Sequence, residues 1–142
     1  MAITQALTTT FKSEILQGVH NFAAAGGDVF KIALYTAAAG LSSETAVYTT
    51  SGEVVGTGYT AGGAILTNLG VATSGTAAYT SWNNVVWATA TIAASGALIY
   101  NSSKGNKTVA VLNFGGTYLA TAAPFTITFP PNSAATAVVI IN

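Results

Sequence analysis

Apolar residues recur at helical spacing only near the start of the chain. They stand three or four positions apart, as on one face of a helix, at Phe11, Ile15, Leu16, Val19 and Phe22. The threonines of Thr8–Thr10 are typical helix N-caps, and Gly26-Gly27 suits a helix end. The pattern predicts a helix from about Thr9 to Ala24. Its opposite arc is polar and includes Glu14 and His20.

After these glycines the pattern changes to a period of two, which is typical of β-strands. The segment from Phe30 to Tyr35 alternates in this way and predicts a strand with one face in the core. Six further strands are predicted, at about residues 64–69, 84–93, 97–101, 108–114, 125–129 and 137–141. Turn or strand-breaking pairs separate them, at Gly62-Gly63, Ser74-Gly75, Ser95-Gly96, Gly115-Gly116 and Pro130-Pro131. Residues 101–106 give the clearest hairpin loop.

These elements predict one mainly β domain over residues 1–142. About seven short strands with frequent turns indicate an antiparallel β-sandwich or a jelly-roll-like barrel with one N-terminal α-helix. Within it, residues 1–27 form an N-terminal arm and helix, and residues 28–142 form the β domain. Residues 37–50 and 71–81 lack a clean period and are interpreted as long loops, where contacts to partners are common.

Charge is the unusual part of the composition. The chain has four lysines, no arginine and four acidic residues, so charged residues make up 6% and the net charge is zero, with a mean hydropathy of +0.54. Ordinary soluble domains carry about a quarter charged residues, and a nearly uncharged surface promotes association. We therefore expect an assembly subunit that forms a homo-oligomer, with a trimer as the leading expectation.

The same composition argues against other partners. Four lysines balanced by four acids give little to neutralise phosphates, so no nucleic-acid partner is expected. No apolar run approaches the roughly 20 residues of a membrane helix, so no membrane partner is expected either. The first residues lack the features of a secretory signal, which indicates synthesis in a cytoplasm.

Catalytic chemistry has few candidate residues. The chain has no cysteine and a single histidine, His20. The sequence contains no G-x-S-x-G nucleophile elbow with which this histidine could act. We therefore interpret His20 as a solvated or interface histidine. Glu44 and Glu53 could pair as acid and base, but both lie in threonine- and serine-rich segments typical of solvated loops. The segment Gly56–Ala61 matches a dinucleotide fingerprint, but two more glycines follow where a helix should begin. We expect no enzymatic activity, cofactor or metal site.

The sequence is compatible with three roles for the two tryptophans. Trp82 and Trp87 follow Tyr79 closely, and such rings can fill a core, anchor a protein interface or stack on sugars. The candidate interface residues are six ring-bearing side chains: Phe11, His20, Tyr59, Tyr79, Trp82 and Trp87.

Four segments of the chain resemble segments of a known protein family. They are Phe-Lys-Ile-Ala-Leu-Tyr-Thr at 30–36, Gly-Thr-Gly-Tyr-Thr-Ala-Gly-Gly at 56–63, Gly-Ala-Leu-Ile-Tyr-Asn at 96–101 and Leu-Asn-Phe-Gly-Gly at 112–116. In this order they resemble small virion structural proteins of tailed bacteriophages, over nearly the whole chain. The resemblance implies a non-enzymatic decoration or cement subunit of the phage head, bound between major capsid proteins. The alternative is a carbohydrate- or receptor-binding β module of a phage fibre or tail.

Overall fold

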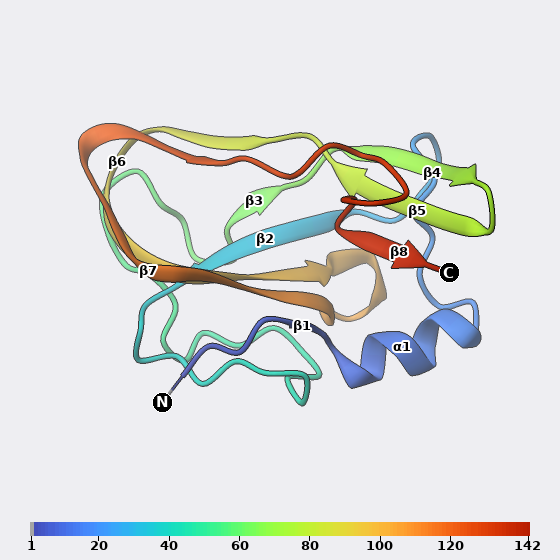
Figure 1. Cartoon of the computed structure of the whole chain (residues 1–142). Helices are drawn as coiled ribbons and strands as arrows, with labels where there is room; N and C mark the ends of the chain where they lie inside the picture. The colour runs from blue at the N-terminus through green and yellow to red at the C-terminus, as the bar shows by residue number, and fades with distance from the viewer. Residues whose placement is uncertain (1) are drawn as a thin grey trace.

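The structure, a computed structural model, describes residues 2–142 as a mainly β fold (Figure 1). Its elements in chain order are β1 (Ala6–Leu7), α1 (Thr9–Leu16), β2 (Phe30–Tyr35), β3 (Ala64–Ile65), β4 (Asn68–Ser74), β5 (Ala77–Trp82), β6 (Val85–Asn101), the 3₁₀ turn η1 (Ser102–Lys104), β7 (Lys107–Ile127) and β8 (Val139–Ile141). The strands pair antiparallel in two sheets, ordered β1-β7-β6-β2-β3 and β4-β5-β8. The arrangement confirms the predicted mainly β, sandwich-like class with one N-terminal helix, and the described strands close no barrel.

Two long strands build both layers of the sandwich. β6 has 17 residues and β7 has 21, and they bend together so that the hairpin runs back over itself (Figure 1). Their inner halves, residues 96–101 and 107–113, pair with each other beside β2. Their outer halves, residues 85–94 and 118–127, lie in the opposite layer and enclose a shared core with the inner sheet.

The core lies on both faces of the inner sheet. The larger cluster fills the space between the layers and includes Phe30, Ile32 and Trp82. A second cluster covers the other face of β2 and includes Ala33 and Tyr35. The expectation that only one face of this strand is buried was therefore wrong, because the start of the chain and the long loop after β2 cover the second face.

The helix begins where the sequence predicted but is shorter. Thr8 caps it, since its Oγ1 accepts a hydrogen bond from the Phe11 amide at 3.3 Å. The helix ends at Leu16, and Gly18 takes a left-handed conformation (φ +70°) that turns the chain away. The predicted continuation to Ala24 was wrong, because this earlier glycine already supplies the stop.

The glycine pairs were only partly good markers of strand ends. The predicted hairpin loop at 101–106 and the turn at Ser74-Gly75 are confirmed. The predicted breaks at Ser95-Gly96 and Gly115-Gly116 are wrong, because β6 and β7 run on through them and bend there. A Cβ on Gly96 would lie 2.6 Å from the Leu112 carbonyl oxygen, so this glycine permits a close backbone approach. Residues 71–81, expected as a loop, contain most of β4 and β5.

Residues 3–7 contact the sheet and do not form a separate arm. Ala6 and Leu7 of β1 pair with Val111 and Ala110 of β7. Ile3, at 8% exposure, joins the second core cluster.

Candidate assembly surface

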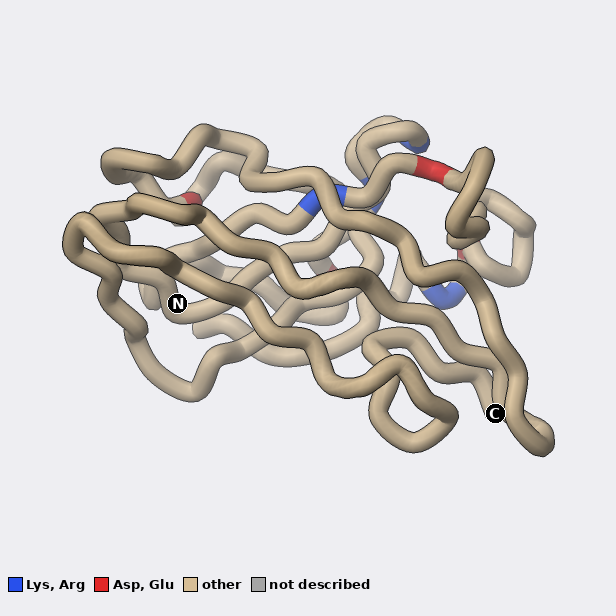
Figure 2. Tube along the Cα trace, turned by 90° about the horizontal axis from the view of Figure 1, so that it is seen from above, with Lys and Arg blue, Asp and Glu red and all other residues tan. Residues whose placement is uncertain are grey.

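The charged residues are confined to two segments of the chain. All eight lie between residues 12 and 53 or between residues 104 and 107, so residues 54–103 and 108–142 carry none. The uncharged stretches include β4, β5, β8 and the outer halves of β6 and β7, which we call the charge-free layer. Figure 2 looks down on the molecule from above, and its nearest strands show neither blue nor red.

Large apolar side chains are exposed on the charge-free layer. Leu119 of β7 is 76% exposed and Val71 of β4 is 60% exposed. The others are Leu69, Val86, Tyr118 and Ile141. The strands that carry these side chains have no charged residue of their own, so protein contacts on them have little charge to desolvate.

This layer also has an open strand edge. The outer half of β7 pairs with β6 on one side only, because β1 reaches no further than Val111. The corresponding edge of β6 is covered, since the Thr91 amide donates to the Thr57 carbonyl at 2.9 Å. Edge strands of monomeric proteins are usually protected by charges, prolines or bulges. From Gly115 to Thr121 this edge has neither a charge nor a proline, but its register against β6 shifts on both sides of residues 118–120.

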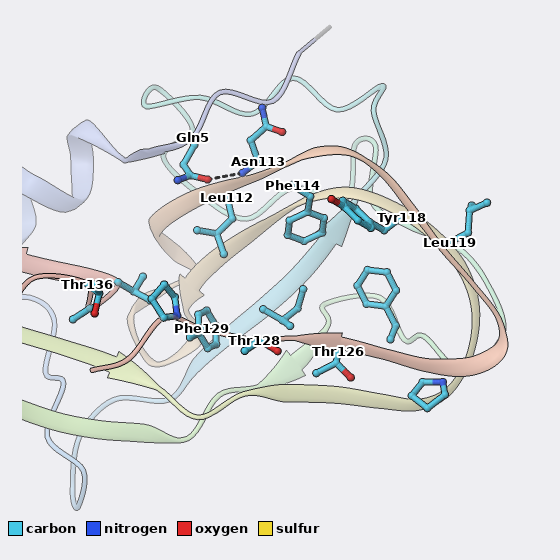
Figure 3. Close-up of a pocket in the computed structure, with 16 residues that line it drawn as sticks. Gln5, Leu112, Asn113, Phe114, Tyr118, Leu119, Thr126, Thr128, Phe129 and Thr136 are labelled. Atoms are coloured by element: carbon cyan, nitrogen blue, oxygen red, sulfur yellow. Dashed lines mark hydrogen bonds between the residues drawn. The ribbon is translucent and has the colours of Figure 1, made fainter. Parts of the chain in front are cut away.

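An apolar groove of about 680 Å³ follows the bend of β7 (Figure 3). Leu112 and Phe114 line it before the bend, and Phe125, Ile127 and Phe129 line it after the bend. Aromatic rings pack across it, with Phe114 and Phe125 centroids 6.4 Å apart. The groove was missed in the sequence because it depends on a bend where a strand break was predicted.

Four of the six candidate interface residues are interior. Phe11, Trp82, Trp87 and His20 are between 2% and 8% exposed. Trp82 packs among phenylalanines and donates its indole N–H to Asn68 Oδ1 at 2.9 Å. Their assignment to a contact surface is therefore corrected, because burial removes these rings from any partner. The same burial contradicts a sugar platform made of the two tryptophans, which needs exposed rings.

Tyr79 and Tyr59 are half-buried, and their role as contacts stays a prediction. Tyr79 lies on β5 and lines a second, smaller groove of about 450 Å³ beside the end of α1. Tyr59 points inward, since its hydroxyl donates to Glu53 Oε1 at 2.7 Å and accepts from the Leu34 amide at 2.9 Å.

His20 belongs to a buried polar network and not to a solvated helix face. The Asn101 side-chain amide donates to His20 Nδ1 at 2.9 Å, and its oxygen accepts from the Ser103 amide, which fixes its orientation. His20 Nδ1 is therefore the acceptor, and the proton on Nε2 is donated to Glu14 Oε1 at 3.2 Å. Lys107 Nζ lies 2.8 Å from Glu14 Oε2. The network ties α1 to the hairpin loop.

The pKa of Glu14 reflects two opposing effects. Burial raises the pKa, but hydrogen bonds from Lys107 and His20 outweigh burial and leave it below the ordinary value of 4.5. Glu14 is therefore a carboxylate at neutral pH and balances the lysine.

Glu53 is also buried, which corrects the expectation of a solvated loop carboxylate. It is 8% exposed and accepts hydrogen bonds from the Tyr48 hydroxyl at 2.6 Å and the Gly62 amide at 2.7 Å, in addition to Tyr59. Burial, followed by the nearby Glu53 carboxylate, raises the pKa of Tyr100 to about 12 and also raises the pKa of Tyr48. The cluster fixes the loop that covers the second face of the inner sheet.

The catalytic alternatives find little geometric support. Glu44 is exposed and Glu53 is enclosed by tyrosines, so the two carboxylates have different environments. The Gly56–Ala61 segment is irregular chain beside β6 and leads into no helix. Within residues 2–142, no group of three His, Cys, Asp or Glu side chains could hold a metal ion. Over the same residues, no helix is long and apolar enough to cross a membrane.

Comparison with known proteins gives no match, whether to family models, to curated proteins or to solved structures.

Proposed function

We propose that this protein is a non-enzymatic structural subunit of a bacteriophage virion that binds the head as decoration or cement, between major capsid proteins. The observation that carries the proposal is the charge-free layer, with its exposed apolar side chains and open strand edge. Such a surface favours burial against protein, because no charge has to be desolvated. The resemblance of the four segments to phage virion proteins supports the same assignment.

Attachment in this proposal comes from apolar contact and backbone pairing. Neither interaction weakens much when added salt shortens the Debye length from about 10 Å at 0.1 M to about 3 Å at 1 M. Among the charged residues, Glu14 and Lys107 are used inside the subunit, since they pair with each other and Glu14 also accepts from His20.

The test uses two exposed valines as a matched pair. Val86 lies in the charge-free layer at 54% exposure, and Val47 lies in the charged part at 53% exposure. Purified wild-type, Val86→Lys and Val47→Lys proteins are mixed with phage heads that lack this subunit, and binding is measured by co-sedimentation. We expect Val86→Lys to weaken binding by about tenfold or more, because a buried unpaired lysine is costly, and Val47→Lys to bind normally.

The same binding assay is repeated at high salt concentration. Wild-type protein is expected to stay bound at about 1 M salt. Release by salt, or equal weakening by both substitutions, contradicts attachment through the charge-free layer. Absence of binding at every concentration contradicts the head location itself.

A further inference from the structure

The single histidine of the chain is buried among aromatic rings. His20 is 7% exposed, and the ring centroids of Phe11, Phe22 and Phe30 lie between 5.1 and 6.4 Å from its imidazole. Histidine is the side chain that ordinarily changes its charge near neutral pH. Any change in the charge of His20 therefore has to be accommodated by the groups that bond its two nitrogens.

These groups belong to a network in which both signs of charge are present. Two oppositely charged pairs form it: Glu14 with Lys107 at 2.8 Å and Asp28 with Lys104 at 3.9 Å. Glu14 accepts a hydrogen bond from His20 Nε2, and Asp28 shares the Asn101 amide with His20 Nδ1. Each carboxylate is matched by a lysine while the histidine is neutral. A proton added to the histidine is attracted by both carboxylates, so the charge can be held within the fold.

The Asn101 side chain, however, is compatible only with the neutral form of His20. Its nitrogen donates one hydrogen to His20 Nδ1 at 2.9 Å and the other to Asp28 Oδ2 at 2.8 Å, and its oxygen accepts from the Ser103 amide at 3.0 Å. A second proton on the imidazole sits on Nδ1, where it faces this nitrogen as donor against donor. Turning the amide over places its oxygen against the Asp28 carboxylate and its nitrogen against the Ser103 amide. Asn101 is fully buried, so each of these losses is costly.

We propose that His20 is a proton-dependent switch that holds the hairpin loop at 101–106 in place at neutral pH and loosens it in acid. One proton from solvent binds Nδ1 and breaks the hydrogen bond from Asn101, and the imidazolium is then stabilised by the carboxylates of Glu14 and Asp28. Asn101 is the N-cap of η1, so its displacement removes the acceptor of the Ser103 amide. The switch does not depend on the proposed virion role.

The presence of one histidine makes the protonation state directly measurable. In protein labelled with nitrogen-15, the imidazole NMR signals report which ring nitrogen carries the proton. We expect the Nε2–H tautomer at about pH 7.5, and a shift of the Asn101 side-chain amide signals as His20 takes up its second proton in acid. An Nδ1–H tautomer at neutral pH, or Asn101 signals that do not follow the protonation of His20, overturns the switch.

Hydrogen exchange of the Ser103 amide measures the release of the loop. After correction for the intrinsic exchange rate, its protection in wild type should fall about tenfold or more between about pH 7.5 and about pH 5.5. His20→Gln is the matched variant, because glutamine offers a donor and an acceptor but takes up no proton in this range. Its Ser103 protection should change less than about twofold over the same interval. Circular dichroism checks that the variant folds.

The Thr91 amide provides a control within wild type, which keeps the test valid if His20→Gln does not fold. It donates to the Thr57 carbonyl, outside the network, and its protection should stay constant over the same pH interval. An equal fall at Ser103 and Thr91 indicates general loosening and overturns the switch. An equal fall at Ser103 in wild type and His20→Gln also overturns it, because another group is then responsible. Neither measurement involves phage heads, so its outcome is separable from that of the proposed function.

Discussion

Trp82 connects the two layers at the level of a single side chain. It is 2% exposed and packs against Phe22, Phe30 and Phe129, while its N–H is satisfied by Asn68. Trp82→Ala removes these contacts, leaves a cavity and deprives Asn68 of its donor. We expect the free energy of unfolding to fall by about 3–5 kcal/mol in urea denaturation. Tyr118→Ala, at an exposed ring, is expected to change it by about 0.5 kcal/mol. A loss below about 1 kcal/mol for Trp82→Ala would contradict this position in the core.

Glu14 gives the stability a predictable dependence on acid. Its folded pKa lies below the ordinary value of 4.5, so its stabilising contribution is complete above the unfolded-state pKa and is lost as the pH falls through the folded value. The free energy of unfolding of wild type is therefore expected to decrease below about pH 5, and Glu14→Gln is expected to show a shallower decrease.

Glu44→Gln is the matched control for this profile. Glu44 is exposed, and among the described residues its carboxylate accepts a hydrogen bond only from the Ser43 hydroxyl. Its substitution is expected to leave the dependence on pH unchanged. Identical profiles for wild type and Glu14→Gln would show that the network does not stabilise the folded state through this carboxylate.

The sequence predicted the burial of some individual residues correctly and of others wrongly. The helical spacing correctly predicted that Phe11 is buried. It wrongly placed His20 on a solvent-exposed helix face and Leu16 on a buried face. Gly18 ends the helix first, so Leu16 is 89% exposed and His20 enters the interior on an irregular segment. The burial of Glu53 was missed because its segment is rich in serine and threonine, although the tyrosines that bond it, Tyr48 and Tyr59, lie only five and six residues away.

Among the elements, β1 is the least expected. Its pairing with β7 and the burial of Ile3 make the first residues part of the fold. Ile3→Ala is expected to lower the free energy of unfolding by about 2–4 kcal/mol, and Ile65→Ala, at a residue 66% exposed on β3, by less than about 1 kcal/mol. Equal effects in denaturant unfolding would show that the N-terminal segment is detached, as the sequence alone suggested.

The strand pattern predicted the inner sheet well and the outer layer less well. β2 and the hairpin at 101–106 have strong alternation and clear turn residues, and both were predicted. β4 and β5 consist largely of small and polar residues, so their partly exposed faces give no clear alternation. The glycines at 95–96 and 115–116 resemble turn signals, because the sequence cannot distinguish a bend within a strand from its end.

For the whole molecule, the proposed assembly role depends more on where the charges lie than on how few there are. The composition predicted a surface that other proteins cover, and in the fold the strands of the outer layer, β4, β5, β8 and the outer halves of β6 and β7, carry no charge (Figure 2). Composition could not predict this concentration, because it depends on how the long hairpin folds back. The same bend creates the groove along β7 and leaves the β7 edge open.

A density map of intact phage particles tests the central claim most directly. The account predicts that this fold occupies sites on the head, with the charge-free layer buried against protein neighbours and Lys12 and Glu44 on the side facing solvent. A map that places the chain outside the head, or that shows the charge-free layer facing solvent while the charged part contacts the capsid, would contradict the account.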